Sequence, residues 1–248
     1  QLFAHIDMVL CEGPYMRQSI INLGCPSEKV QVHHLGVRVD EIAFQPRAWR
    51  QGQKLRVLIA ASFIEKKGIP DALTALGRLQ NEVDLEITII GDAPAGERYR
   101  FEKEKILQTL TTFQLMERTR LLGYQPHNVL FKEAFEHHLF ISPSFIASDG
   151  NTEGGAPVSL IEMSATGMPI VSTTHCDIPE VVLHGRSGLL APERDVDKLV
   201  EHLRWLIHHP EEWAAMGTAG RQHVEKEYSA QIQGERLANV YEALLQRD

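Results

Sequence analysis

The amino-acid sequence predicts an α/β fold in which a parallel β-sheet is flanked by helices. Short β-branched runs alternate with longer amphipathic runs, as they do in parallel strand–helix units. Several of the short runs are apolar almost throughout, as expected for strands that helices cover on both faces. Hydrophobic residues make up 43% of the 248 residues, which is enough for one large domain or two small ones with a sizeable core.

Seven short runs are predicted as strands because β-branched and aliphatic residues dominate them. In chain order, these strands are residues 6–10, 30–33, 55–61, 85–90, 120–122, 139–141 and 169–172. The alternation of strand and helix continues for about five units and ends near Leu190.

Helical periodicity fills the segments between the strands. Residues 69–79 place Ala72, Leu73, Leu76 and Leu79 on one face, at three- and four-residue spacing. Further helices are predicted over residues 97–115, 158–166 and 196–207, and the end of the chain is predicted to be helical over 195–208, 211–228 and 230–245. The mixed charges of residues 97–105 predict a solvated helix face.

The clearest boundary lies at residues 36–54, where periodicity fails amid proline, glycine and polar residues. The segment before it is a small β-α-β unit that is too short to form a domain alone. The chain begins at Gln1, with neither an initiator methionine nor a signal peptide. We therefore expect the chain to be a piece of a longer protein.

The charge balance argues against a nucleic-acid partner. The 25 lysine and arginine residues face 33 acidic residues, for a net charge of −8, whereas nucleic-acid-binding proteins are basic. No apolar run approaches the roughly 20 residues that a membrane span needs. Cys11, Cys25 and Cys176 show no paired spacing, which favours reduced thiols in the cytosol.

The most informative segment is residues 149–163, a glycine-containing loop between a strand and a helix. Its glycines let the backbone approach a ligand, and the following helix N-terminus offers free N–H groups to a phosphate. Glu153 precedes this anion site, Pro157 suits the first helical turn, and Glu162 lies further along the helix. Such loops also occur without a ligand, but flanking carboxylates favour hydroxyl groups and hence a sugar nucleotide over ATP with magnesium.

A second cluster, residues 62–68, also joins a strand to a helix. A lysine at the mouth of a parallel sheet can neutralise a diphosphate leaving group. The alternative interpretation of this cluster is a solvated basic turn. The sequence contains neither a P-loop nor a Gly-x-Gly-x-x-Gly fingerprint, which excludes the usual mononucleotide and dinucleotide sites.

Seven segments occur in an order that resembles glycosyltransferase family 4. They are residues 65–69 (EKKGI), 89–92 (IIGD), 141–144 (ISPS), 153–162 (EGGAPVSLIE), 167–172 (GMPIVS), 178–182 (IPEVV) and 185–190 (GRSGLL). Each segment is a weak signal alone, but together they are specific. The resemblance runs from about Asp7 to the C-terminal helix and implies the GT-B architecture, two Rossmann-like domains with the active site in their cleft. This chain would be the C-terminal half, a Rossmann-like parallel sheet flanked by helices.

The resemblance also implies a reaction, the retaining transfer of a sugar from a nucleotide diphosphate donor to an acceptor. Glu153 matches the first glutamate of the family's paired motif, which contacts the donor sugar, and Lys67 matches its phosphate-binding lysine. These two residues are the expected catalytic residues. The expected donor-binding residues are Ser62, Gly91, Tyr124, Gly154, Gly155, Ala156, Pro157, Val158 and Glu162, of which Glu162 would bind the ribose.

Two positions depart from the family pattern. Eight residues separate Glu153 from Glu162, whereas the family usually has seven, and the extra residue falls within residues 154–156. The family's phosphate-binding arginine is replaced by Ser62, so neutralisation of the diphosphate would rest on Lys67, with Lys66 as a helper.

The resemblance further implies a division of the chain. Residues 1–39 would be the remnant of an N-terminal acceptor domain and its hinge, residues 40–228 the donor-binding domain, and residues 229–248 the helix that crosses back to the first domain. The expected partners are a nucleotide sugar and the missing acceptor domain, with no nucleic acid. The expected location is the cytoplasm, with peripheral association at the inner face of the membrane as an alternative, and the expected role is polysaccharide biosynthesis.

Two other functions compete with glycosyl transfer. The chain is expected to be inactive by itself, so one alternative is a nucleotide-sugar-binding module without transfer activity. The other is an epimerase of the same architecture, which isomerises the donor sugar. The observation that separates them is whether an acceptor is needed for the nucleotide to be released.

No cofactor or metal is expected. Adjacent histidine pairs rarely chelate one ion because their side chains diverge. The most ligand-like trio is His175, Cys176 and Asp177, which we interpret as a hydrogen-bonded loop. A Gly-x-Ser-x-Gly elbow is absent, which argues against a serine hydrolase. The three tryptophans, Trp49, Trp205 and Trp213, are interpreted as packing residues.

Overall fold

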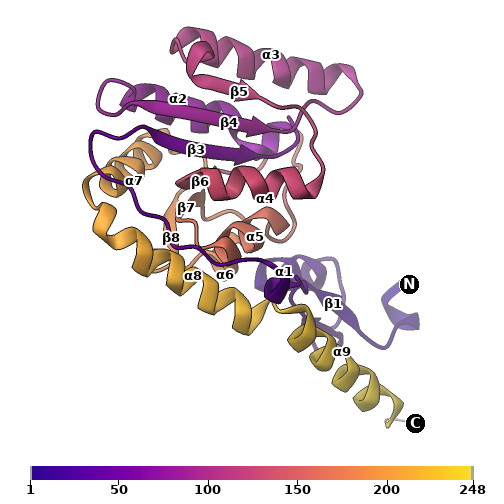
Figure 1. The fold of residues 1–248 in the computed structure, drawn as a ribbon. Coiled ribbons are helices and arrows are strands. Elements are labelled where there is room, and N and C mark those ends of the chain that lie inside the picture. The colour runs from indigo at the N-terminus through magenta and orange to yellow at the C-terminus, as the bar shows by residue number, and fades with distance from the viewer. Residues whose placement is uncertain (1, 247–248) are drawn as a thin grey trace.

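The computed structural model describes residues 2–246 and contains a six-stranded parallel sheet (Figure 1). Its strands are β3 (Leu55–Ala60), β4 (Leu85–Ile90), β5 (Thr119–Leu121), β6 (Leu139–Ser142), β7 (Ile170–Thr173) and β8 (Gly188–Ala191). They are arranged in the order β5-β4-β3-β6-β7-β8, so the direction of winding reverses between β3 and β6. At this reversal, Val57 pairs with Leu139 and Leu58 with Phe140.

Helices cover both faces of this sheet, and β3 shows how the two layers are built. Val57 and Ile59 pack into one core cluster, whereas Leu58 between them packs into the other, because successive side chains of a strand point to opposite faces. The first cluster includes residues of α2 (Ile69–Leu79), α3 (Glu97–Thr112) and α7 (Val196–His208); the second includes residues of α4 (His127–Glu136), α5 (Val158–Thr166), α6 (Ile178–Val181) and α8 (Trp213–Glu227).

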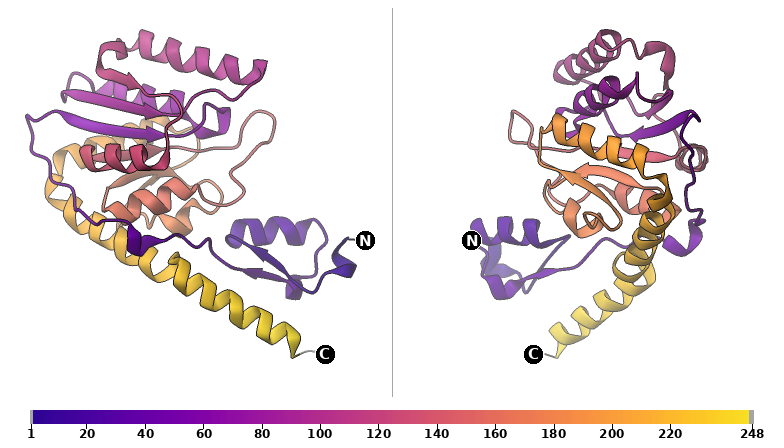
Figure 2. Two further views of the ribbon diagram at one scale, coloured as in Figure 1. Left: turned by 45° about the vertical axis from the view of Figure 1, so that its right-hand side comes forward. Right: turned by 90° about the vertical axis from the view of Figure 1, so that its left-hand side faces the viewer.

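The N-terminal residues form a separate small unit. Strands β1 (Val9–Cys11) and β2 (Val30–Val32) pair in parallel, and α1 (Pro14–Asn22) connects them. Figure 2 shows this unit set apart from the main sheet, with α9 (Ala230–Leu245) extending along the same side of the molecule. Short 3-10 helices occur at Leu2–His5, Ser27–Lys29, Val39–Glu41, Glu65–Lys67, Met116–Arg118 and Pro210–Glu212.

The predicted fold agrees with the structure at its most regular elements. The helices predicted over residues 69–79, 158–166 and 230–245 and the strand over 85–90 have the predicted bounds. The strand predicted over residues 6–10 begins only at Val9. The Lys29 ammonium binds the carbonyl oxygens of Phe3 and Ile6 at 3.1 and 2.7 Å, which fixes this segment outside the ladder.

Two further expectations hold only in part. The charged side chains of Glu97, Arg100 and Glu104 are exposed on a solvated helix face, as predicted. Glu102 is buried instead, because it shares the inner face of α3 with Ile106 and Leu110 at four-residue spacing. Trp205 is 38% exposed beside the ring of His209, so it is only partly a packing residue. Trp49 and Trp213 are buried and stack with ring centroids 5.7 Å apart, as predicted.

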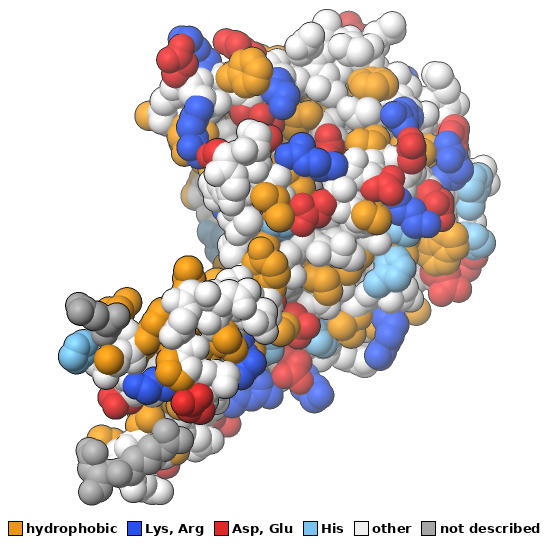
Figure 3. Space-filling view, turned by 180° about the vertical axis from the view of Figure 1, so that it is seen from behind, with side chains coloured by type: hydrophobic (Ala, Val, Ile, Leu, Met, Phe, Trp, Pro, Cys, Tyr) orange, Lys and Arg blue, Asp and Glu red, His pale blue; other side chains and the backbone are white. Residues whose placement is uncertain are grey.

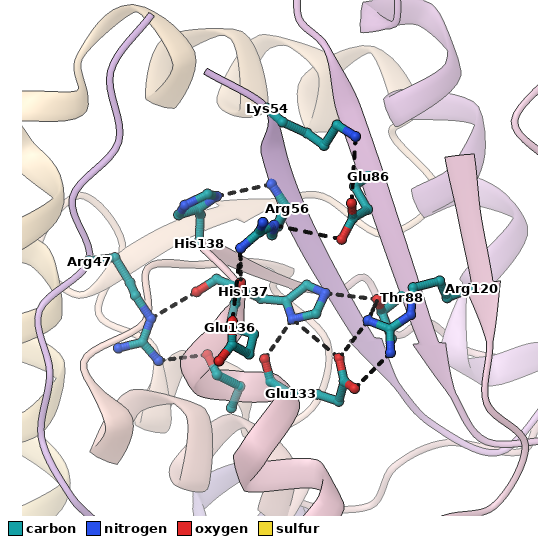
Figure 4. A network of polar contacts seen from close by, with 11 residues as sticks. Arg47, Lys54, Arg56, Glu86, Thr88, Arg120, Glu133, Glu136, His137 and His138 are labelled. Atoms are coloured by element: carbon teal, nitrogen blue, oxygen red, sulfur yellow. Dashed lines mark hydrogen bonds and ion pairs between the residues drawn. The ribbon is translucent and has the colours of Figure 1, made fainter. Parts of the chain in front are cut away.

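A buried polar network holds the amino-terminal edge of the sheet (Figure 4). The guanidinium of Arg47, in the segment that enters β3, donates to the carbonyl oxygens of Ala134 and His137 at 2.8 and 2.9 Å and to that of Thr166 at 3.1 Å. These carbonyls lie at the C-terminal ends of α4 and α5, where few intrahelical donors remain. The carbonyl of Ala134 also accepts from the N–H of His137 at 3.4 Å, and the carbonyl of Thr166 from the N–H of Gln45 at 3.0 Å. Burial lowers the pKa of Arg47 to about 10, so it stays charged at neutral pH.

Within residues 2–246, no helix is both long and apolar enough to cross a membrane.

Replacing Arg47 is expected to destabilise the fold. In Arg47→Met, the carbonyl of His137 loses its donor and the carbonyls of Ala134 and Thr166 keep one donor each, so the free energy of unfolding should fall by about 2 kcal/mol. Urea unfolding followed by circular dichroism measures this change. The control is Lys54→Met, whose ammonium is half-exposed at 3.7 Å from Glu86 and should contribute less than about 0.5 kcal/mol. Equal effects of the two substitutions would contradict the capping role of Arg47.

The same network predicts a loss of stability in mild acid. The N–H of Arg56 donates to Nδ1 of His138 at 3.0 Å, and burial lowers the pKa of His138 to about 4. As pH falls below about 6.5, His138 therefore takes up a proton in the unfolded chain before it does so in the folded protein, which favours unfolding. After allowance for the partial exposure of His138, the free energy of unfolding should fall by about 1 kcal/mol between pH 7 and pH 5. His138→Asn keeps an acceptor but no titration, so its unfolding free energy should change less over this range.

Candidate functional site

The candidate site lies where the winding of the sheet reverses, at the carboxyl ends of β3 and β6. Crevices at such reversals are where open α/β sheets bind ligands. The loop after β3 carries Lys66 and Lys67, and the loop after β6 carries Ser144 and Glu153. The structure therefore brings the two expected catalytic residues, Glu153 and Lys67, together from opposite sides of the reversal.

The carboxylate of Glu153 is held by three side chains. The ammonium of Lys67 lies 2.8 and 2.9 Å from its two oxygens, Ser144 donates at 2.8 Å, and the ammonium of Lys66 lies at 3.4 Å. The side chain of Glu153 is only 6% exposed. Although burial acts to raise its pKa, the charge and hydrogen bond of Lys67, with Ser144 and Lys66, lower the pKa below its usual range. Glu153 is therefore an anion at neutral pH.

The two loops approach each other closely at Gly68. This residue has φ +63°, and a Cβ there would lie 2.1 Å from the carbonyl oxygen of Pro143. Lys66 ties the same loops together, because its carbonyl accepts from Phe145 at 2.9 Å and its ammonium donates to the carbonyl of Thr152 at 2.6 Å. Lys66 thus anchors the loop that carries Glu153.

The N-terminus of α5 lies directly after this loop. Helix α5 begins at Val158, with Pro157 as the N-cap residue and without a side-chain cap. Within residues 2–246, the N–H groups of Gly155, Ala156 and Val158 have no hydrogen-bond acceptor. Free amides at a helix N-terminus bind anions, because the helix dipole places partial positive charge there.

A cavity of about 340 Å³ opens beside the start of α5 and contains a second group of the expected residues. It is lined by Ala60, Ala61, Ser62, Ile90, Gly91, Tyr124, Gln125, His127, Leu130 and Ser159. Gly91 has φ +132°, and a Cβ there would lie 1.9 Å from the carbonyl oxygen of Ala61, so only glycine fits. The hydroxyl of Tyr124 donates to the carbonyl of Asp92 at 2.7 Å, which fixes its ring at the cavity mouth.

Glu162 reaches the cavity through a partner that the sequence did not reveal. It is buried in α5, and its carboxylate lies 2.7 Å from Nε2 of His127, which lines the cavity. His127 follows Tyr124 by three residues at the start of α4, a helix that was not predicted over these residues. The position of His127 three residues after Tyr124, an expected donor-binding residue, is the one sequence signal for His127.

The trio His175, Cys176 and Asp177 forms a hydrogen-bonded turn, as interpreted from the sequence. Nδ1 of His175 lies 2.7 Å from the carboxylate of Glu193, and its Nε2 accepts from the N–H of Glu153 at 3.1 Å. The carboxylate of Asp177 accepts from the N–H groups of Tyr15 and Met16 at 2.7 and 3.3 Å. Among the described residues, no group of three or more His, Cys, Asp or Glu side chains is placed to hold a metal ion.

The surface is hollowed between the small N-terminal unit and the main body (Figure 3). The Asp177 contacts cross from the main body to α1 in this small unit. A larger hollow of about 480 Å³ lies between β2 and α9 and contains none of the expected site residues.

Fold and site together define an α/β domain in which lysine ammonium groups and helix N-terminal amides without acceptors gather at the reversal of a parallel sheet, an arrangement that suits an anionic ligand. A sequence model of the family described as glycosyl transferases group 1 matches residues 41–223. The chain belongs to this family.

Similar proteins agree with this assignment. The amylovoran biosynthesis glycosyltransferase AmsK of Erwinia amylovora is 32% identical over 245 residues, which cover 98% of this chain and 58% of that protein. The putative colanic acid biosynthesis glycosyltransferase WcaL of Escherichia coli K12 is 31% identical over 247 residues, with the same two coverages. The chain thus spans 58% of the length of these relatives.

The fold is shared with solved structures. Anabaena Alr3699/HepE, in complex with UDP-glucose, superimposes with a TM-score of 0.82 at 17% identity, over 96% of this chain and 64% of that one. The predicted fold class, a Rossmann-like parallel sheet flanked by helices, is confirmed.

Removing Lys67 is expected to destabilise the site through Glu153. In Lys67→Met, the buried carboxylate keeps Ser144 and Lys66 but loses its nearest cation, so unfolding should become easier by about 2 kcal/mol. The double variant Lys67→Met/Glu153→Gln should recover part of this loss, which a double-mutant cycle in urea measures. As a control, Lys103→Met removes an exposed 2.7 Å pair with Asp92 and should cost less than about 1 kcal/mol. Strict additivity of the two site substitutions would contradict the coupling.

Proposed function

We propose that this chain is the donor-binding half of a retaining glycosyltransferase of family 4, which transfers a sugar from a nucleoside diphosphate to an acceptor. The observation that carries the proposal is the juxtaposition of Glu153 and Lys67 with the free amides before α5. One carboxylate, two ammonium groups and a helix N-terminus suit a ligand that has hydroxyl groups on one side and a diphosphate on the other.

The nucleoside is assigned to the cavity of about 340 Å³. Its base would lie against Gly91 and Tyr124, where the backbone at Gly91 permits close approach. Glu162 would accept hydrogen bonds from the ribose hydroxyls, with His127 2.7 Å away fixing the carboxylate. Ser62 and Ser159 line the path from the base to the start of α5.

The diphosphate is assigned to the backbone of residues 154–158 at the start of α5. There its charge would be neutralised by free amides, by the helix dipole and by Lys67, with no metal ion required. The ammonium of Lys67 donates to Glu153 at 2.9 Å. When the sugar–phosphate bond breaks, negative charge grows on the diphosphate, and Lys67 stabilises it while Glu153 positions the sugar.

The division of the chain follows from the same proposal. Residues 1–39 would be the last segment of an N-terminal acceptor domain and its hinge. Residues 40–228 would bind the donor, and residues 229–248 would form the helix that crosses back to the acceptor domain. Because the chain spans 58% of its two relatives, transfer would need the remaining part. The names of those relatives, which give amylovoran and colanic acid biosynthesis, favour a role in polysaccharide biosynthesis. The cytoplasm, with association at the inner face of the membrane as the alternative, stays the proposed location.

Calorimetric titration with a panel of UDP-, GDP- and ADP-sugars tests the proposal. Binding of one class of donor is expected, and failure to bind any of them would overturn the donor-binding assignment. With the full-length protein, release of the nucleotide is measured with and without an acceptor. A transferase is expected to release the nucleotide in proportion to the acceptor that it glycosylates. A changed sugar nucleotide without an acceptor would indicate an epimerase instead, and binding without turnover would indicate a binding module.

Replacing Glu162 should weaken nucleotide binding through the ribose. Glu162→Gln keeps the size of the side chain but loses its charge, so affinity for the preferred nucleoside diphosphate should fall about 10- to 100-fold. Titration with the 2′-deoxy nucleotide is the matched control, because wild type should lose affinity on removal of the hydroxyl and the variant should lose much less. An equal loss in both proteins would contradict the ribose contact.

A further inference from the structure

His175 is a buried histidine that contacts the backbone of Glu153. It lies in the turn after β7, is 1% exposed, and its Nε2 accepts the N–H of Glu153 at 3.1 Å. An imidazole nitrogen that accepts a hydrogen bond carries no proton. The proton of the neutral ring therefore lies on Nδ1, which donates to the carboxylate of Glu193 at 2.7 Å.

Glu193 also fixes the beginning of the loop that ends at Glu153. Its second carboxylate oxygen accepts from the N–H of Ile146 at 2.8 Å. The neighbouring guanidinium of Arg194 donates to the carbonyl of Ile146 at 2.8 Å and lies 3.9 Å from the ring centroid of Phe145. The turn between β8 and α7 thus holds one end of the loop directly and the other end through His175.

We propose that His175, oriented by Glu193, is a positioning residue that sets the backbone of Glu153 for contact with the donor sugar. This inference rests on the proposed function, in which Glu153 contacts the sugar hydroxyls. His175 acts through the backbone, whereas Lys67 and Ser144 hold the carboxylate itself.

The backbone contact matters most when the donor is bound. Lys67 forms an ion pair with Glu153, and in the proposed complex the diphosphate competes for the same ammonium. The contact from His175 does not depend on Lys67, so it remains when that ammonium turns to the phosphate. A displacement of a reacting group by about 1 Å can reduce a rate 100-fold, so a fixed backbone at Glu153 has a measurable consequence.

The contact is also sensitive to pH. The charged and titratable groups around His175 are Glu193 from the β8–α7 turn, Cys176 with its Sγ 3.1 Å from Nε2, and Tyr15 of α1 beside Cys176. Burial acts to lower the pKa of His175, but Cys176 and Glu193 outweigh it and raise the pKa above its ordinary value. Below this pKa, Nε2 carries a proton and no longer accepts the N–H of Glu153.

Two substitutions separate positioning from packing. The terminal amide of Gln reaches the position of Nε2 and can accept the N–H of Glu153, whereas the shorter amide of Asn reaches only the position of Nδ1. His175→Gln should therefore retain the contact, and His175→Asn should lose it. Amide hydrogen exchange of the unliganded chain tests this directly, with faster exchange at Glu153 expected in His175→Asn and near wild-type exchange in His175→Gln.

Binding then tests the consequence for the sugar. The probes are UDP with UDP-glucose and GDP with GDP-mannose, of which the pair that wild type binds is used. In His175→Asn, affinity for the nucleotide sugar should fall about tenfold with affinity for the bare nucleotide unchanged, since the bare nucleotide has no sugar for Glu153 to contact. The unchanged nucleotide affinity also shows that the variant is folded.

The dependence of binding on pH provides a second measurement. It compares wild type with His175→Gln, so it does not depend on whether His175→Asn folds. In wild type, the affinity for the nucleotide sugar, whose diphosphate has no titrating terminal group, should decline as pH falls through the pKa of His175, and in His175→Gln it should decline less. Parallel profiles in the two proteins, or wild-type exchange at Glu153 in His175→Asn, overturn the positioning role. Absence of binding to every nucleotide by wild type overturns the proposed function instead, and the exchange result then decides the role of His175 alone.

Discussion

The site depends on one topological constraint, the reversal of winding between β3 and β6. Because the two strands are neighbours while their following helices pack on opposite faces of the sheet, the loops at their carboxyl ends lie side by side at one edge of the sheet. Lys66 and Lys67 of one loop meet Ser144 and Glu153 of the other there. The contacts between the two loops do not arise from nearness in the sequence, since Lys67 and Glu153 are 86 residues apart.

Buried charge has a different role at each edge of the sheet. At the amino-terminal edge, the guanidinium of Arg47 donates to carbonyl groups at the ends of α4 and α5, to the hydroxyl of Thr166 and to the carbonyl of Gln45, so protein groups satisfy this charge. At the carboxyl edge, Lys67 and Glu153 satisfy each other beside amides that have no acceptor among residues 2–246. At the first edge, the protein's own groups satisfy the buried charge, whereas at the second edge backbone amides remain available to a ligand.

The sequence predicted the regular elements well because local periodicity is enough to define them. Helix α5 and helix α9 had the predicted bounds, and the residues expected at the site fall on two loops and one cavity. Strand β8 and helix α6 have four residues each, too few to show a period, and α4 was not predicted over its residues. His127 and His175 were missed as site residues because their roles come from contacts across 35 and 22 residues of chain. Glu102 was misplaced because charge pattern outweighed its spacing to Ile106 and Leu110.

The cap that Asp177 places on α1 joins two parts of the molecule that otherwise touch little. Its carboxylate balances the first amides of a helix in the small unit, while its own N–H donates to the carbonyl of Gly155 at 3.3 Å. Gly13 has no room for a side chain against this carboxylate. Moving the small unit away from the main body would leave the carboxylate of Asp177 and two amides of α1 without partners, beside the loop that carries Gly155. The position of the small unit and the conformation of that loop are therefore linked through one residue.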